Sequence, residues 1–276
     1  MANTLTLTTV SNINHALVEF SIEKTISAVP CIDEIKIFSN KTLDLNKSYD
    51  FIDIGDRFSL ADYSFFLIKE LNQYIDTTHV LVTQYDGFGV NSEYWKEEYF
   101  DYDFIGPPTS FNHPPIKSIL KDCRIAKKGW FVGGGGFSLR SKKLLNALQD
   151  PKIAAGFHNY STNSDWCSED ISICIIYKEY LEKEHGIKFA PVELAIDFSA
   201  EYLTGYDACL GFHSIENIPF FLTEKECTFY LQNLKVNRSS YKLKKLVANL
   251  FCKNYNTLLN SDLIIDMLHP QLDYNN

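Results

Sequence analysis

Strand and helix patterns alternate through the first 110 residues of the chain, and this alternation restricts the fold more than any other feature of the sequence. The third strand pattern is continuously apolar, as in a parallel strand that is buried on both faces. A strand-helix-strand-helix-strand order predicts a doubly wound α/β fold, in which helices flank a mostly parallel sheet. The expected strands are residues 5–10, 34–39 and 79–84, and the expected helices are residues 16–29 and 63–75.

Length, charge and cysteine content exclude several classes of protein. With 276 residues, the chain can bury a core without disulfides or a structural metal. Its formal net charge of −9 argues against a general nucleic-acid binder, because such proteins need a positive surface. The seven cysteines are widely spaced and form no C-x-x-C pair, which predicts reduced thiols in a cytoplasmic protein.

We expect neither a signal peptide nor a membrane span. The first residues lack a basic block followed by an apolar one, and no uninterrupted apolar stretch reaches about 18 residues. Residues 235–253 alternate lysines with apolar side chains. This pattern suits either a helix that makes peripheral contact with an anionic membrane or a helix that docks on the protein with its lysines in solvent.

Ligands of doubly wound sheets bind beyond the carboxyl ends of the strands, so the residues after Gln84 are the first candidates for a site. Asp86 follows the buried strand there, and a carboxylate in this position is suited to hold a divalent cation against a diphosphate. The alternative is that Asp86 and Gly87 form an ordinary turn. A second acidic pair, Asp101 and Asp103, is typical of a turn and has a lesser prospect of contacting substrate.

Four consecutive glycines, Gly133 to Gly136, stand between aromatic residues and precede a helix expected from Ser141. Such a run costs backbone entropy, which suits a backbone that passes close to a ligand and donates its N–H groups. Gly134 and Gly135 are the candidate contacts. The run is not a Walker loop, because the Gly-Lys-Ser/Thr ending is missing, and it lacks the context of a dinucleotide fingerprint. A glycine-rich bulge packed beneath the helix is the alternative.

Two adjacent carboxylates, Glu169 and Asp170, precede an amphipathic helix. They favour the helix dipole as N-terminal capping residues, which is the plain interpretation. Alternatively, one carboxylate orients an acceptor hydroxyl while the other takes its proton. His213 lies farther along, in an apolar stretch where a single histidine is usually a core residue with its hydrogen bonds satisfied.

Taken in order, these motifs resemble a GT-A-fold glycosyltransferase, and more closely a bacterial, glycosyltransferase-like family known only as a domain of unknown function. The resemblance covers residues 1–215 and implies a GT-A-like, Rossmann-like catalytic domain there, followed by a mostly helical extension over residues 216–276. The motifs that carry it are Gln84-Tyr85-Asp86-Gly87-Phe88, Asp101-Tyr102-Asp103-Phe104-Ile105-Gly106, Gly135-Gly136-Phe137-Ser138-Leu139-Arg140-Ser141, Glu169-Asp170, Phe189-Ala190-Pro191 and Gly211-Phe212-His213.

The resemblance implies transfer of a sugar from a nucleotide-diphosphate sugar to a hydroxyl of a glycan or glycolipid, in the synthesis of a surface polysaccharide or glycoconjugate. Mn²⁺ or Mg²⁺ would neutralise the departing diphosphate, held by Asp86 and His213 with Gln84 as a neutral helper. Gln84 occupies the first position of the family's D-x-D motif, so Asp86 is its single anionic ligand, and metal-independent catalysis stays open.

Further site residues follow from the same resemblance. Asp170 would be the general base on the acceptor hydroxyl, which implies inversion at the anomeric carbon, while Glu169 would hold the acceptor. Val10 and Ser11, after the first strand, would meet the base and ribose of the donor.

Two other functions remain open at this stage. A nucleotidyltransferase that makes sugar nucleotides usually carries a glycine-rich, basic phosphate loop near its N-terminus, and residues 5–14 contain no Gly, Arg or Lys. A non-catalytic carbohydrate- or protein-binding module would keep the sheet without turnover. Trp130 and Trp166 are candidates to stack on sugar faces, with core packing as the alternative.

Overall fold

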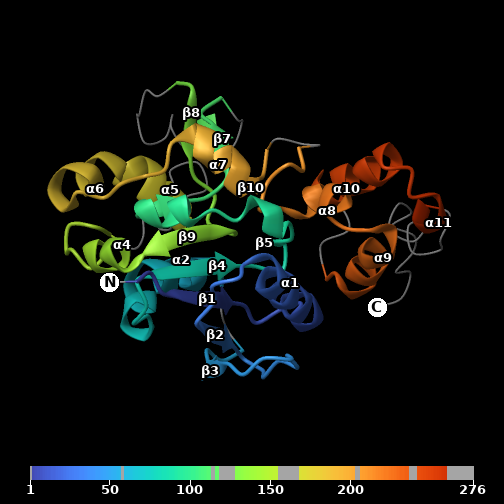
Figure 1. Cartoon of the computed structure of the whole chain (residues 1–276), viewed down its shortest axis with the longest axis horizontal. Helices are drawn as coiled ribbons and strands as arrows, with labels where there is room; N and C mark the ends of the chain where they lie inside the picture. The colour runs from blue at the N-terminus through green and yellow to red at the C-terminus, as the bar shows by residue number, and fades with distance from the viewer. Residues whose placement is uncertain are drawn as a thin grey trace, which may run out of the picture.

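The fold is a mixed α/β arrangement around a central, mostly parallel sheet, which confirms the predicted fold class at this level (Figure 1). The computed structural model describes residues 2–56, 59–112, 116–117, 128–154, 168–202, 206–235 and 241–259. The first four strands of the sheet run parallel, and β9 lies antiparallel to both β4 and β6. In spatial order the strands are β3 (Asp50–Asp53), β2 (Glu34–Ser39), β1 (Leu5–Val10), β4 (His79–Thr83), β9 (Ser138–Ser141) and β6 (Phe104–Ile105).

The three predicted strands and the first predicted helix are confirmed to within a residue or two. All six residues of β1 are buried, as are all five of β4, because these strands lie in the middle of the sheet. The helix α1 (His15–Ala28) follows Asn14, which adopts a left-handed conformation with φ of 52°. It ends just before Pro30, whose ring disfavours a helical conformation in the preceding residue.

The second predicted helix begins earlier and is less regular than the apolar spacing indicates. It starts at a capping box, in which the side chains of Ser59 and Asp62 each accept a hydrogen bond from the other's backbone N–H. The segment consists of α2 (Leu60–Phe65), a π-helical turn, η1 (Phe66–Glu70), and a 3₁₀ turn, η2 (Leu71–Tyr74). The prediction rested on apolar spacing alone and therefore missed the polar start of the helix.

Two small sheets and several short helices complete the chain up to residue 213. The second sheet contains β10 (Ser199–Ala200), β11 (Gly211–His213) and β5 (Gly87–Gly89), and β7 (Pro108–Ser110) pairs with β8 (Trp130–Val132). The helices are η3 (Ser92–Tyr94), η4 (Glu97–Asp101), α4 (Lys142–Ala147), α5 (Glu169–Ile171), η5 (Ser172–Ile176), α6 (Lys178–His185) and α7 (Val192–Phe198).

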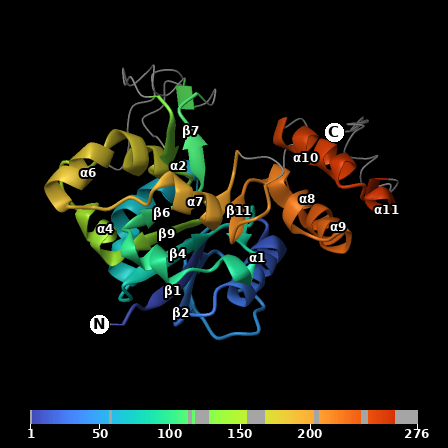
Figure 2. The same cartoon turned by 45° about the horizontal axis from the view of Figure 1, so that its top comes forward.

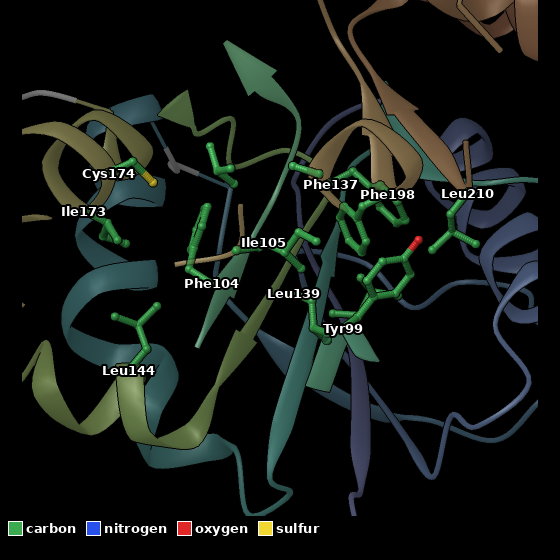
Figure 3. Close-up of a cluster of buried hydrophobic side chains, with 14 of the residues drawn as sticks. Tyr99, Phe104, Ile105, Phe137, Leu139, Leu144, Ile173, Cys174, Phe198 and Leu210 are labelled. Atoms are coloured by element: carbon green, nitrogen blue, oxygen red, sulfur yellow. The ribbon is translucent and has the colours of Figure 1, made fainter. Parts of the chain in front are cut away.

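Aromatic rings fill much of the main core. Figure 3 shows Tyr99, Phe104, Phe137 and Phe198 gathered beside the aliphatic Leu139 of β9. Phe137 stacks on Phe198 with ring centroids 5.0 Å apart, and Tyr99 meets Phe198 edge-on at 5.2 Å. Such offset and edge-to-face pairs are favourable beyond the area they bury, so core packing accounts for part of the high aromatic content.

The C-terminal helices form a group at one side of the molecule (Figure 2). Their apolar side chains share a cluster with Leu17 of α1 and Phe88 of β5, and the Tyr230 hydroxyl donates a 2.8 Å hydrogen bond to the Tyr85 carbonyl. The predicted domain division after residue 215 stays a prediction. The helices are η6 (Ile215–Asn217), α8 (Ile218–Phe221), α9 (Glu224–Asn233), α10 (Tyr241–Cys252) and α11 (Asn256–Leu259).

The lysine-rich helix α10 docks on the protein. Its side chains Leu243, Leu246 and Leu250 are buried, and the helix packs against η6 and α8. Tyr241 and Phe251 of the same helix are exposed. The docking interpretation therefore describes the buried face of residues 241–252, and a membrane contact through 235–253 stays a prediction. Residues 236–240 lie outside the described part of the chain. Within that part, no helix is long and apolar enough to cross a bilayer.

Candidate functional site

A pocket of about 470 Å³ lies beyond the carboxyl ends of β1 and β4, where the topology of the sheet predicts a ligand site. Segments that are far apart in the sequence meet in its wall, and eight of the nine predicted site residues are among them. These are Val10, Ser11, Gln84, Asp86, Gly135, Glu169, Asp170 and His213. Their chemical roles stay predictions, but their convergence on one pocket is a property of the fold.

The tight turn between β4 and β5 presents Asp86 to the pocket. Gln84 and Gly87 exchange two backbone hydrogen bonds, of 2.8 and 3.1 Å, and the Asp86 carbonyl accepts one of 2.6 Å from the Ser214 N–H. A Cβ on Gly87 would lie 2.7 Å from the Gly136 carbonyl oxygen and 2.9 Å from the His213 ring, so the residue must be glycine. Asp86 and Gly87 therefore do form a turn, and the turn itself belongs to the pocket wall.

His213 is held by an ion pair with Glu201. Its Nδ1 lies 3.0 Å from Glu201 Oε1, so Nδ1–H donates to this carboxylate. The other ring nitrogen, Nε2, faces Gly136 and Gln84, because a Cβ on Gly136 would lie 2.2 Å from Nε2 and 2.7 Å from Gln84 Oε1. Burial lowers the pKa of His213, but the Glu201 carboxylate outweighs it and raises the value to about 9.

The atoms around Gly136 fit a divalent cation in part. Asp86 provides a carboxylate, Gln84 an amide oxygen, and His213 a ring nitrogen whose orientation Glu201 fixes, an arrangement common around metal-ligating histidines. Among the described residues, no cluster of three or more His, Cys, Asp and Glu side chains is able to hold an ion. The donor set is incomplete by itself, so binding of Mn²⁺ or Mg²⁺ stays a prediction that needs further oxygen ligands from outside the protein.

Glu169 forms a buried ion pair with Arg140. Its Oε1 accepts a 3.0 Å hydrogen bond from Arg140 Nη2, and the two side chains are 4% and 0% exposed. Burial raises the pKa of Glu169, Asp170 adds to the rise, and Arg140 opposes it. Arg140 also donates to the Gly135 carbonyl at 3.4 Å and to Ser138 Oγ at 3.1 Å. Within the protein, Glu169 therefore contacts Arg140. That Glu169 holds the acceptor stays a prediction.

Asp170 is half-buried and lines the pocket in the first turn of α5. Ser168 precedes this turn without making a side-chain capping hydrogen bond. Asp170 therefore combines the two interpretations of the sequence, since it lies near the positive end of a helix and also faces the pocket.

Gly134 is the predicted ligand contact that does not line the pocket. Its φ is +77°, and a Cβ would lie 2.4 Å from Pro107 Cγ and 2.6 Å from Glu201 Oε2. The packed-bulge interpretation thus explains Gly134, whereas Gly135 and Gly136 expose their backbone to the pocket. Close packing against neighbours on both sides is the reason that the run needs several glycines.

Two further sequence candidates lie away from the pocket. Asp103 is buried and accepts hydrogen bonds from Ser141 Oγ at 2.5 Å and from the Lys188 N–H at 2.8 Å, so it joins structural elements rather than contacting substrate. Trp130 is 48% exposed on β8 and is not part of the pocket wall. Trp166 lies outside the described residues.

The pocket also contains residues to which the sequence assigned no functional role. Tyr63 of α2 and Lys242 of α10 line it, and Glu201 orients His213. Tyr63 was expected at the start of a core helix, and Lys242 belongs to the basic run. A local pattern could not single them out, because their neighbours in space are remote in sequence.

The sequence model of a family described as "Protein of unknown function (DUF5672)" matches residues 48–213, more than half of the chain. The chain belongs to this family. The DUF5672 region contains the site residues from Tyr63 to His213, while Val10, Ser11 and Lys242 lie outside it. No curated protein matches the chain.

Two solved structures are similar to this DUF5672 chain at a distant level. One is the galactosyltransferase LgtC in complex with donor and acceptor sugar analogues, at 11% identity over 75% of this chain and 86% of that chain, with a TM-score of 0.47. The other is A197 from STIV, at 12% identity over 68% and 80% of the two chains, with a TM-score of 0.34. Structural similarity at this level does not support a conclusion about function.

Gly135 and Gly136 in the pocket wall provide a test of this geometry. Neither has a positive φ, so alanine causes no backbone strain at either position, and the two glycines face different side chains. In Gly135→Ala, the new Cβ would lie 1.8 Å from Glu169 Oε1 inside the buried ion pair. We expect chemical denaturation to show a loss of about 1–3 kcal/mol in the free energy of unfolding. Gly136→Ala crowds pocket-facing atoms of His213 and Gln84 and should cost less stability. A larger loss for Gly136→Ala than for Gly135→Ala would contradict these positions.

Proposed function

We propose that the chain transfers a sugar from a nucleotide-diphosphate sugar to an acceptor hydroxyl. The observation that carries the proposal is the convergence of Asp86, His213 and Asp170 on one pocket, beside the exposed backbone of Gly135 and Gly136. Groups suited to a diphosphate and a group suited to take a proton thus share one wall. The GT-A resemblance of the same motifs supports the proposal.

The nucleotide would lie at the end of β1. Val10 and Ser11 line the pocket there and would meet the base and ribose. Ile13 and Leu60 are 49% and 59% exposed at the rim of the same pocket, where an aromatic base would cover apolar surface. This end of the pocket therefore combines an apolar rim with the strand terminus.

The diphosphate would lie between the β4–β5 turn and α10. A bound Mn²⁺ or Mg²⁺ would act there as a Lewis acid on the departing diphosphate. Asp86 and His213 would hold it, with the Gln84 amide as a neutral ligand. His213 would first have to lose its Nε2 proton, because only a neutral ring nitrogen binds a metal. Lys242 would add positive charge from the C-terminal extension, since its charge acts on both Glu201 and His213.

Asp170 would act as the general base. The acceptor oxygen would bond to the anomeric carbon as the bond from that carbon to the diphosphate oxygen breaks, and the diphosphate would leave with the electron pair. The hydroxyl proton would pass to Asp170, and attack from the face opposite the leaving group would invert the anomeric carbon. The acceptor in this proposal is a glycan or glycolipid of a surface polysaccharide or glycoconjugate.

A non-catalytic binding module is the second candidate. Two features favour it. Gln84 has an amide at a position where the GT-A motif has a carboxylate. The described residues also offer few ionisable metal ligands. An enzyme slowly hydrolyses its donor and releases nucleotide in the presence of Mn²⁺, whereas a binding module releases none. The sugar nucleotidyltransferase alternative lacks a basic, glycine-rich loop after β1.

Donor binding is tested by thermal denaturation with UDP-, GDP-, CMP- and dTDP-sugars, each with and without Mn²⁺. A ligand that binds the native state at 100 times its Kd stabilises the fold by about 2.7 kcal/mol. We expect one nucleotide class to raise the Tm, and Mn²⁺ to enlarge that rise. A flat response to every compound would contradict the proposed function.

Asp170→Asn tests the base. We expect transfer to fall by about 10²–10⁴-fold, the usual contribution of general-base catalysis, while donor affinity is unchanged. Asp76→Asn is a matched control, because Asp76 is exposed near the start of β4, at the other end of the strand from the pocket. The assignment fails if Asp170→Asn keeps its activity, or if it folds but no longer binds the donor.

Lys242→Ala tests the contribution of the extension. Removing this charge should weaken binding of the nucleoside diphosphate about three- to tenfold, as expected for one partly solvated ionic contact. Lys244→Ala removes an equally exposed charge from the same helix at a position that does not line the pocket, and it should leave the affinity unchanged. Equal effects of the two variants on Kd, measured by calorimetry, would indicate a general charge effect and exclude a local contact.

A further inference from the structure

The wall of the pocket contains a buried hydroxyl without a hydrogen-bond partner. Tyr63 is 7% exposed and lines the pocket, and its hydroxyl oxygen makes no hydrogen bond. The Gln84 side chain lies near enough to this hydroxyl to lower its pKa, but the contact falls short of hydrogen-bond geometry. Buried polar groups are nearly always paired, so an orphan that faces a pocket indicates a partner in the ligand.

The position of Tyr63 is fixed by the start of α2. The capping box of Ser59 and Asp62 sets the first turn of this helix, directly before Tyr63. Ser59, Leu60 and Tyr63 line the pocket together with Gln84 and Glu169. The hydroxyl is thus a rigidly placed group, which is the property expected of a residue that selects among ligands.

The charges that act on Tyr63 locate it within the pocket. They come from Glu169, Arg140 and Asp170, whereas the charges that act on His213 include Asp86 and Lys242. Tyr63 therefore lies on the side of the pocket that holds the two adjacent carboxylates. Arg140 balances the charge of Glu169, whereas the Asp170 carboxylate would repel a phosphate or an acidic group, so a neutral group suits this side of the pocket best.

Burial raises the pKa of Tyr63 well above its usual range, and the Glu169 carboxylate adds to this rise. The side chain is therefore a neutral phenol at physiological pH. It can donate one hydrogen bond and accept another, which matches the two-way hydrogen bonding of a sugar hydroxyl.

We infer that Tyr63 binds a hydroxyl group of the transferred sugar and selects for a neutral, hydroxylated sugar over an acidic one. The inference rests on the proposed function, since it assigns the sugar to the part of the pocket between the diphosphate end and Asp170. Tyr63 is then a specificity residue for the donor. Its contact is with the sugar, and the nucleotide binds elsewhere in the pocket.

Tyr63→Phe tests the inference, because it removes one oxygen atom and keeps the ring. The probes are UDP-glucose, UDP-galactose, GDP-mannose and dTDP-glucose, together with UDP-glucuronic acid and the free diphosphates UDP, GDP and dTDP, all measured by calorimetry with Mn²⁺. For a neutral sugar nucleotide that binds the wild type more tightly than its free diphosphate, we expect Tyr63→Phe to weaken binding about 3- to 10-fold. The affinity for the free diphosphate should not change.

The stability of the unliganded protein separates a ligand contact from a structural role. Loss of an unpaired buried hydroxyl should leave the Tm of the free protein unchanged or raise it, whereas loss of a structural hydrogen bond would lower it. Tyr74→Phe is the matched control, because Tyr74 packs on Phe38 and Phe66 and does not line the pocket. It should leave every affinity unchanged.

The possible results distinguish this inference from the proposed function. If the wild type binds no sugar nucleotide and no free diphosphate, the proposed function fails and the inference fails with it. If the wild type binds a neutral sugar nucleotide and Tyr63→Phe binds it equally well, the inference alone is overturned. Three other results would also overturn the inference. Tyr63→Phe could lose affinity equally for the free diphosphate, or the unliganded variant could have a lower Tm than the wild type. The wild type could also prefer UDP-glucuronic acid over UDP-glucose.

Discussion

The ion pair between Arg140 and Glu169 is the contact on which the geometry of the pocket depends. It joins the start of α5 to β9 and to the glycine run that directly precedes this strand. Both side chains are buried, so neither charge has water as an alternative partner. Removal of one partner from such a pair typically costs about 3–5 kcal/mol, because the other charge is left uncompensated. Asp170 follows Glu169 directly, so the pair also fixes where its carboxylate faces.

The charges around the pocket are divided between two ends. At one end, Glu201 and Asp86 surround His213, and the pKa of His213, which burial alone would lower, is raised to about 9 by Glu201. At the other end, Asp170 stands beside a Glu169 whose charge is balanced by Arg140. A ligand with an anionic end and a neutral, polar end matches this division. The proposed donor, a nucleotide-diphosphate sugar with an uncharged sugar, would be such a ligand, since its charge is confined to the diphosphate.

The elements that a local pattern defines were predictable from the sequence. Buried parallel strands have a continuous apolar signature, so β1, β2 and β4 were predicted, and the rule that ligands bind beyond strand ends led directly to Asp86. The glycine run pointed to a close backbone approach. Local sequence could not, however, separate Gly134, which packs on Pro107, from Gly135 and Gly136, which face the pocket.

The contacts that could not be predicted are those between distant segments. Arg140 lies on a short strand, 29 residues before Glu169, and no local pattern links the two. Glu201 was unassigned because its function depends on the ring of His213, which a different strand presents. Tyr63 was expected only as the first residue of a helix, because an unpaired hydroxyl becomes visible only when its surroundings are known.

The pocket extends beyond the region that defines the family. The DUF5672 match ends at His213, whereas Lys242 reaches the same pocket from α10, whose apolar face is docked on η6 immediately after His213. Asn249 of α10 strengthens this docking with a 2.7 Å hydrogen bond to the Glu216 carbonyl. The extension therefore both supports the backbone that follows His213 and supplies a charge to the wall. A change in the extension can alter the charge near His213 in the pocket while every residue of the family region stays the same.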